Sequence, residues 1–259
     1  MAGTQSESLI MGKSGNRQVQ FKQFTVCDDR CAMKVGTDAL LLGAWCHVEQ
    51  SRSILDIGSG SGIITLMLAQ RASKANLVGV ELELNAYEQC NENIHRSPFA
   101  DRIETCNQSV QEFSKEAKRL NAFEVVVSNP PFFHDKPKSP DLARNLARHD
   151  DSLSLAELLE SSLRCLKSSG RLMLVWPMER REELHAEAKV QGLHLVRELT
   201  IQGSPDHVST RFLSEWSRGA CSTVIQERMC IEMGGRLNGQ VLLSPTYKKL
   251  LGPYVQSLD

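Results

Sequence analysis

Two short segments hold residues whose types and spacing suit chemistry at the end of a β-strand. Residues 54–62 (ILDIGSGSG) place an aspartate and three glycines at alternate positions, and residues 125–132 (VVVSNPPF) end in an Asn-Pro-Pro-Phe loop. The first pattern suits a backbone that passes close to a cofactor, because glycine adopts positive φ at little cost. The second offers carbonyl oxygens and an aromatic ring to a planar amine. Together they predict a donor and an amine acceptor that meet at one edge of a sheet.

The Asn-Pro-Pro-Phe loop holds the residues that we expect to be catalytic: Asn129, Pro130, Pro131 and Phe132. The Asn129 side-chain carbonyl and the Pro130 backbone carbonyl can each accept a hydrogen bond from an NH₂ group. Such bonds draw the nitrogen toward sp³ geometry and aim its lone pair at an electrophile, which is an orientation effect. The prolines stiffen the loop, and Phe132 offers a face for stacking a flipped base, worth about 1–3 kcal/mol. A plain turn between a strand and a surface loop is the structural alternative.

The glycine loop has a spacing that separates two classes of cofactor site. The dinucleotide fingerprint G-x-G-x-x-G would need its third glycine at Ile63, which disfavours a dehydrogenase. The Asp-x-Gly-x-Gly-x-Gly pattern instead resembles motif I of the class I S-adenosylmethionine-dependent methyltransferases. The cofactor-binding residues expected in this loop are Asp56, Gly58, Gly60 and Gly62.

Two further positions are expected to contact S-adenosylmethionine. Glu81 closes the second expected strand, where an acidic side chain accepts hydrogen bonds from ribose hydroxyls in Rossmann-like sites. Many class I enzymes carry an acidic residue after the third strand to bind the adenine amine, and the matching place here holds Ser109. Adenine recognition would then depend on the Ser109 hydroxyl and on backbone groups.

Strands and helices alternate along the part of the chain that must position these loops. We expect strands at residues 53–57, 77–81, 102–106, 123–128 and 170–176, with helices at 62–70, 84–95, 110–117 and 179–191. Ser154 and Glu157 predict a capping box for another helix. Residues 193–201, 210–216 and 224–232 are further strand candidates. The alternation predicts an α/β protein with a doubly wound, mostly parallel sheet and a C-terminal antiparallel hairpin.

A segment upstream of the glycine loop narrows the range of possible substrates. Residues 21–45 (FKQFTVCDDRCAMKVGTDALLLGAW) closely resemble the opening of the bacterial tRNA1(Val) (adenine-N6)-methyltransferases. The pieces LDIGSGSG, LMLAQR, GVELE, NENI and SNPPF continue the similarity in order over residues 20–176. The resemblance implies a Rossmann-like class I methyltransferase fold with a seven-stranded sheet.

The same resemblance implies that Lys34, Thr37 and Asp38 lie over the cofactor pocket, and it adds Asn129 to the cofactor-binding residues. A helix is expected to begin near Thr37 and Asp38, because either side chain can cap a first turn. We expect a flexible tail over residues 1–18, a segment over 19–50 that caps cofactor and substrate, and a methyltransferase domain with a C-terminal extension over 51–259.

The composition narrows the class of protein. Apolar residues make up 41% and charged residues 24% of the chain, as in ordinary soluble globular proteins. The eight cysteines complete no zinc pattern, so no metal is expected. No apolar run approaches the ~20 residues that span a bilayer, and the N-terminal residues lack a signal-peptide layout. We therefore expect a cytoplasmic, monomeric protein without a membrane partner.

The charge pattern is compatible with a tRNA substrate. A net charge of −1 argues against nonspecific coating of nucleic acid, although a local basic face is enough for a tRNA enzyme. Two groups of basic residues could form such a face or simply belong to a solvated surface: Lys13, Arg17, Lys22, Arg30 and Lys34, and after the Asn-Pro-Pro-Phe loop Lys136, Lys138, Arg144 and Arg148.

The function implied by the resemblance is transfer of a methyl group from S-adenosylmethionine to N6 of adenine in tRNA, at the adenine 3′ of the anticodon of tRNA1(Val). Two alternatives use the same loop, a protein glutamine-N5 methyltransferase and an rRNA guanine-N2 methyltransferase. A catalytically silent cofactor-sensing or RNA-binding module is disfavoured, because the Asn-Pro-Pro-Phe loop is intact.

Overall fold

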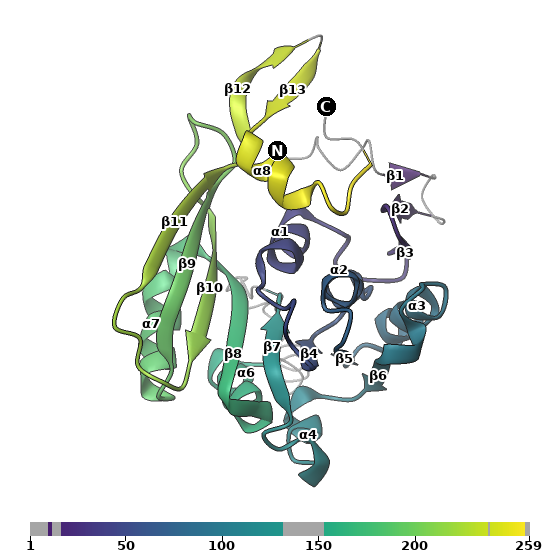
Figure 1. Cartoon of the computed structure of the whole chain (residues 1–259), viewed down its shortest axis with the longest axis vertical. Coiled ribbons are helices and arrows are strands. Elements are labelled where there is room, and N and C mark those ends of the chain that lie inside the picture. The colour runs from purple at the N-terminus through teal and green to yellow at the C-terminus, as the bar shows by residue number, and fades with distance from the viewer. Residues whose placement is uncertain (1–9, 12–16, 132–152, 238, 257–259) are drawn as a thin grey trace, which may run out of the picture.

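The computed structural model describes residues 10–11, 17–131, 153–237 and 239–256, and a large β-sheet forms its centre (Figure 1). In this part of the chain the strand order of the sheet is β11-β9-β10-β8-β7-β4-β5-β6. The strands are β4 (Ser53–Ile57), β5 (Asn76–Glu81), β6 (Ile103–Asn107), β7 (Phe123–Ser128), β8 (Leu166–Pro177), β9 (His194–Gln202), β10 (Arg211–Ser217) and β11 (Ile225–Cys230).

Most of the sheet is parallel. Strands β8, β7, β4, β5 and β6 pair in parallel, so their carboxyl ends share one edge. Strand β10 runs antiparallel between β8 and β9, and β9–β10 is the expected C-terminal hairpin. The sheet has one strand more than the seven expected, because β11 pairs with the otherwise open edge of β9. The pairing with β11 gives hydrogen-bond partners to the backbone N–H and C=O groups on the outer edge of β9.

Helices cover both faces of the sheet, which confirms the doubly wound architecture. They are α1 (Thr37–Trp45), α2 (Ile63–Arg71), α3 (Leu84–His95), α4 (Val110–Phe113), α6 (Leu155–Cys165), α7 (Arg181–Val190) and α8 (Pro245–Leu251). Ile54 and Leu55 are adjacent in β4, yet each belongs to a different apolar core, because side chains alternate across a strand. One core packs α1, α2, α3 and α8 on the sheet, and the other packs α4, α6 and α7.

The two predicted helix caps have different outcomes. The Ser154 side chain and Glu157 form the predicted capping box at the start of α6. Helix α1 begins at Thr37 as expected, but the predicted cap was wrong, because Gly36 is the N-cap residue and no side chain caps the helix. Asp38 is engaged elsewhere, since its carboxylate accepts a hydrogen bond from Arg211 Nε at 3.1 Å.

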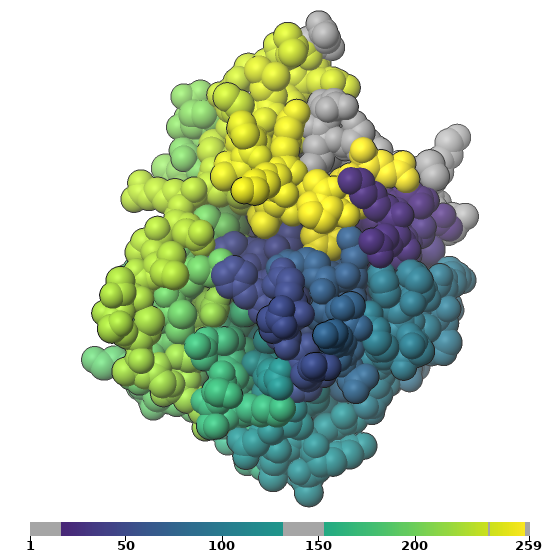
Figure 2. All heavy atoms as spheres, in the orientation of Figure 1, coloured from purple at the N-terminus to yellow at the C-terminus, as the bar shows by residue number. Residues whose placement is uncertain are grey.

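The two ends of the described chain lie together. Strands β1 (Ile10–Met11), β2 (Gln18–Gln20) and β3 (Thr25–Cys27) form a small sheet, while the rest of the expected tail is outside the described residues. The Lys22 amide donates to the Tyr254 carbonyl at 2.7 Å. Figure 2 shows the yellow C-terminal segment against the purple β2–β3 region.

A second small sheet, β12 (Glu232–Leu237) with β13 (Gln240–Leu243), projects at the top of Figure 1. The short helical turns are η1 (Ala100–Arg102), η2 (Ala117–Arg119) and η3 (Met178–Arg180). Among the helices that the structure describes, none has the length and apolar character needed to cross a bilayer.

Arg71 closes the end of helix α1 from the last turn of α2. Its guanidinium donates to the carbonyls of Gly43, Ala44 and Cys46 and pairs with Glu49. The last carbonyls of a helix have no partner within the helix. Packing against α2 partly removes the last carbonyls of α1 from water, and Arg71 supplies their hydrogen-bond donors.

We expect Arg71→Met to lower the free energy of unfolding by about 1–3 kcal/mol, because carbonyls at the end of α1 would lose their donors. Arg96→Met is the matched control, since Arg96 is 63% exposed and pairs with Glu92 on the helix surface. An exposed ion pair contributes only about 0–1 kcal/mol. Urea unfolding followed by circular dichroism measures both variants, and equal losses would contradict this account of Arg71.

Candidate active site

The glycine loop leaves β4 with three residues in the left-handed region. Gly58, Gly60 and Gly62 have φ angles of +71°, +54° and +80°. A Cβ atom at Gly58 or Gly60 would meet nothing within 4 Å, whereas one at Gly62 would lie 2.9 Å from Cys90 Sγ. Gly58 and Gly60 therefore border open space that a ligand could fill. Gly62 allows the loop to pack against α3.

Asp56 is a buried carboxyl in β4, directly before the loop. Thr65 Oγ1 donates to Asp56 Oδ2 at 2.6 Å, while Asp56 Oδ1 has no hydrogen-bond partner in the described part of the chain. Burial raises the pKa of Asp56 to about 7, more than its hydrogen bonds to Thr65 lower it. A buried carboxylate oxygen without a donor is suited to a cationic ligand, because only a charged or hydrogen-bonding partner offsets its desolvation.

Glu81 lies at the end of β5, next to the glycine loop. Its carboxylate accepts hydrogen bonds from the Gly60 amide at 2.8 Å and from the Glu83 amide at 2.9 Å. Asn107, at the end of β6, donates to the backbone carbonyls of Glu81 and Leu82, each at 3.0 Å. These bonds hold the carboxylate beside the loop. Each oxygen keeps lone pairs that can accept further donors, such as two ribose hydroxyls.

The residues around the glycine loop fit S-adenosylmethionine. Its methionine part carries an ammonium group, for which the unpartnered Asp56 oxygen is the matching acceptor. The open space over Gly58 and Gly60 leaves room for the ligand, and Glu81 offers a carboxylate to a ribose. The role of each of these residues toward the cofactor stays a prediction.

The Asn-Pro-Pro segment leaves β7 beside the glycine loop. Ile57 of β4 and Ser128 of β7 are partners in register, so Gly58 and Asn129 follow at the same level on neighbouring strands. Ser128 Oγ donates to the Ile57 carbonyl at 2.8 Å and fixes this level. Asn129 Oδ1 is buried and has no hydrogen-bond partner among the described residues. Asn129 Oδ1, a hydrogen-bond acceptor without a donor, thus lies on the segment next to the glycine loop.

Three of the expected catalytic residues are described by the structure. Pro130 is buried and Pro131 is exposed, so the loop turns toward the surface within two residues. Phe132 and the basic residues at 136–148 lie outside the described residues. Stacking on Phe132 stays a prediction.

The residues that the resemblance placed over the cofactor pocket have other contacts as well. Lys34 Nζ donates to the carbonyls of Asp28, Asp29 and Cys31 at 2.8, 3.0 and 2.8 Å. Thr37 is exposed at the start of α1. Burial raises the pKa of Asp38, and its ion pair with Arg211 opposes that rise. Lys34 holds the backbone of the turn, and Asp38 ties the start of α1 to β10. The contact of either residue with a cofactor stays a prediction.

Ser109 begins the short helix α4. Its hydroxyl oxygen accepts a hydrogen bond from the Glu112 amide at 3.2 Å, as an N-cap does. The hydroxyl hydrogen remains able to donate. Its expected part in adenine recognition stays a prediction. Within the described ranges, no group of three or more His, Cys, Asp or Glu side chains is arranged to hold a metal ion.

Two amides on helix α3 are functional candidates that the sequence did not single out. Asn93 bonds to both backbone groups of Cys27 and to the carbonyl of Ser61 in the glycine loop. Gln89 bonds to the turn that follows Cys27. Their spacing of four residues on one helix face was a signal, but nothing local identified their partners, which lie about sixty residues away.

Comparison with known proteins shows a methyltransferase family. The family model of the methyltransferase small domain matches residues 31–198. A tRNA1(Val) (adenine(37)-N6)-methyltransferase from Trichodesmium erythraeum is 42% identical over 206 residues, covering 79% of this chain and 85% of the relative. One of the same name from Parabacteroides distasonis is 46% identical over 202 residues, covering 78% and 84%.

Solved structures share the fold at low identity. A predicted O-methyltransferase from Agrobacterium tumefaciens matches with a TM-score of 0.63 and 19% identity, covering 84% of this chain and 96% of that one. TYW2 of P. horikoshii in complex with MeSAdo matches with a TM-score of 0.56 and 13% identity, covering 81% and 74%. These likenesses confirm the class I methyltransferase architecture.

The pKa of Asp56 predicts how stability depends on pH. Between the ordinary value of 3.8 and the folded value of about 7, the folded chain binds more protons than the unfolded chain. The free energy of unfolding therefore falls as the pH rises through this range. Asp56→Asn has no such titration. Without added ligand, we expect wild type to lose on the order of 1–4 kcal/mol relative to this variant between about pH 4 and about pH 8.

Urea unfolding of both proteins at several pH values measures this difference. Every other titrating group is common to the two chains, so the difference between their pH profiles reports on Asp56. Parallel profiles for wild type and Asp56→Asn would show that the Asp56 carboxyl is ionised at an ordinary pH in the folded chain.

Proposed function

The chain belongs to the family of the tRNA1(Val) (adenine(37)-N6)-methyltransferases, and we propose that it transfers a methyl group from S-adenosylmethionine to N6 of adenine in tRNA. By analogy with the names of its relatives, the target is adenine 37 of tRNA1(Val). The observation that carries the proposal is the buried, unpartnered Asn129 Oδ1, one residue beyond the strand end that lies beside the glycine loop.

The chain's own groups would hold the cofactor with its reactive end toward Asn129. Asp56 supplies a carboxylate oxygen for the ammonium group, and Glu81 supplies acceptors for the ribose. Gly58 and Gly60 leave the space in which the ligand lies. When bound, S-adenosylmethionine supplies an electrophilic methyl group on a sulfonium.

The acceptor side works by orientation. One N6–H of the adenine donates to Asn129 Oδ1, and the other donates to the Pro130 carbonyl. With both hydrogens held, the nitrogen lone pair points away from them toward the cofactor loop, which lowers the entropic part of the barrier. The amine becomes acidic once it carries the methyl group, so it releases its proton without a strong base. Asn129 therefore needs only to accept a hydrogen bond from the amine and thereby to orient its lone pair.

The segment of residues 19–50 would then cap the cofactor and the substrate. It contains β3 and α1, and its Asp38 pairs with Arg211 at the start of β10. Arg211 is opposite Pro177 at the end of β8, next to β7. The remaining residues, 51–259, carry the sheet, both loops and the C-terminal extension.

We expect Asn129→Ala to lower kcat for tRNA methylation by about 10²-fold or more, because the amine loses an acceptor that positions it for transfer. The affinity for S-adenosylmethionine should stay within about threefold. Asn76→Ala is the matched control, since Asn76 is exposed at the opposite end of β5. Its kcat should equal that of wild type.

The measurement is transfer of a labelled methyl group into tRNA from a strain that lacks the gene, followed by mass spectrometry of the nucleosides. Label in N6-methyladenosine supports the proposal. Label in N2-methylguanosine, or in glutamine of a protein fraction, would assign the chain to one of the other enzymes that share the loop.

A further inference from the structure

Residues 27–38 form a strap that crosses the edge of the sheet where the two loops meet. The strap follows β3, turns through residues 28–35 and enters α1. One end is bonded to helix α3, which follows β5, and the other is bonded to the start of β10. The sheet order places β4, β7 and β8 between these two anchors. The strap therefore spans both the cofactor side and the acceptor side.

Asn93 is the anchor of the strap on the cofactor side. Its Oδ1 accepts from the Cys27 amide at 3.0 Å, and its Nδ2 donates to the Cys27 carbonyl at 2.7 Å. The same Nδ2 donates to the carbonyl of Ser61, in the glycine loop, at 2.9 Å. Asn93 is buried, so a shift of the strap relative to the loop would leave buried polar groups without partners. One side chain thus joins strap and cofactor loop.

Gln89, one turn earlier on α3, binds only the strap. Its Oε1 accepts from the Arg30 amide at 2.8 Å, and its Nε2 donates to Asp29 Oδ1 at 2.8 Å. Two residues of the turn also bind its own backbone. Lys34 Nζ donates to three carbonyls of the turn, and Asp28 Oδ2 accepts from the Val35 amide at 2.7 Å. These bonds tie the turn to α3 and close it on itself.

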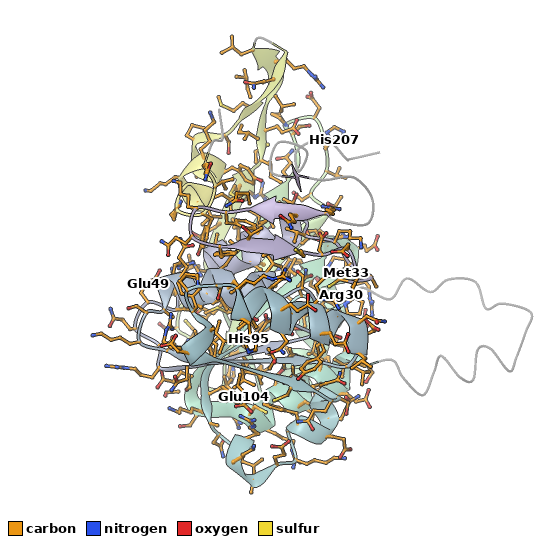
Figure 3. The ribbon with its side chains drawn as sticks, turned by 90° about the vertical axis from the view of Figure 1, so that its right-hand side faces the viewer. Arg30, Met33, Glu49, His95, Glu104 and His207 are labelled. Atoms are coloured by element: carbon orange, nitrogen blue, oxygen red, sulfur yellow. The ribbon has the colours of Figure 1, made fainter. Side chains whose placement is uncertain are left out.

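The turn presents side chains to solvent at the edge. Met33 is 48% exposed, and Figure 3 shows Met33 and Arg30 on the same side of the molecule, opposite Glu49. Beyond the turn, Asp38 binds Arg211, whose strand partner Pro177 ends β8 next to the acceptor strand β7. A tRNA whose adenine reaches Asn129 has to approach this edge. The position of the strap then decides how the tRNA fits.

We propose that Gln89 and Asn93 are positioning residues for the methyl transfer. Gln89 fixes the position of the strap, against which the tRNA binds, and Asn93 fixes the positions of the strap and of the glycine loop relative to each other. The inference rests on the proposed function and deepens it. Neither residue needs to touch a ligand, because each acts through the backbone that it holds. A purely structural role would change stability without separating the two substrates.

The experiment measures KM for tRNA, kcat, and the Kd for S-adenosylmethionine in three variants. Gln89→Met keeps the side-chain volume and removes all three bonds to the turn, from Arg30, Cys31 and Asp29, so KM for tRNA should rise about tenfold while the cofactor Kd stays within about twofold. Asn93→Ala should raise KM for tRNA about tenfold or more and the cofactor Kd at least about threefold. In both, kcat at saturation should stay within about threefold of wild type.

Asn91→Ala is the matched control on the same helix. The Asn91 side chain accepts from the Thr105 hydroxyl at 3.0 Å, and no bond joins it to the strap or the glycine loop. All three constants should stay within about twofold of wild type. If Asn93→Ala does not fold, Gln89→Met still tests the part of the strap in tRNA binding, because it leaves the Asn93–Ser61 bond in place.

Equal effects of Gln89→Met on tRNA and on the cofactor would overturn the inference, and so would an unchanged KM for tRNA in that variant. Failure of the proposed function has a different signature, since wild type would then form no N6-methyladenosine in tRNA at all. The constants are compared only in proteins whose melting temperature lies above the assay temperature.

Discussion

The in-register parallel pairing of β4 with β7 is the constraint on which the site depends. Because Ile57 and Ser128 are partners, the residues that follow them leave the sheet at one level and side by side. The Ser128 hydroxyl, bonded to the Ile57 carbonyl, secures that level from a buried position. A slip of one residue would turn the strand's side chains to the opposite faces and separate the two loops. The glycine loop and the Asn-Pro-Pro segment are neighbours because backbone pairing aligns the two strands that carry them.

The same edge carries polar groups that the fold alone does not satisfy. Asp56 Oδ1 and Asn129 Oδ1 are both buried acceptors without a donor among the described residues. Such atoms lower stability, and apolar packing on both faces of the sheet offsets their cost. Leaving them without partners in the fold keeps them available to ligands. The site is therefore preorganised at some expense of stability.

Polar side chains from distant parts of the chain hold segments at both edges of the sheet. At the edge opposite the two loops, Arg71 closes α1, and Arg102, which directly precedes β6, donates to the carbonyls of Ala69, Ala72 and Ala75 at and just after the end of α2. Asn93 and Arg211 hold the strap at its two ends. Each donor reaches a backbone carbonyl or a carboxylate of another segment. Long-range hydrogen bonds as well as apolar packing therefore hold the strap and the helices around the sheet.

Most strands and helices of the central sheet, and the two loops at its edge, follow from local patterns that the sequence alone displays. Strands Ser53–Ile57 and Phe123–Ser128 and helix Leu84–His95 begin and end where expected, since apolar runs and caps act over a few residues. The folded chain was needed to show that β11 joins the sheet beside β9, that Arg211 is the partner of Asp38, and that Asn93 contacts Cys27 and Ser61. An edge strand or a buried amide takes whichever partner the folded chain brings near. That partner can lie sixty or more residues away, where no local pattern records it.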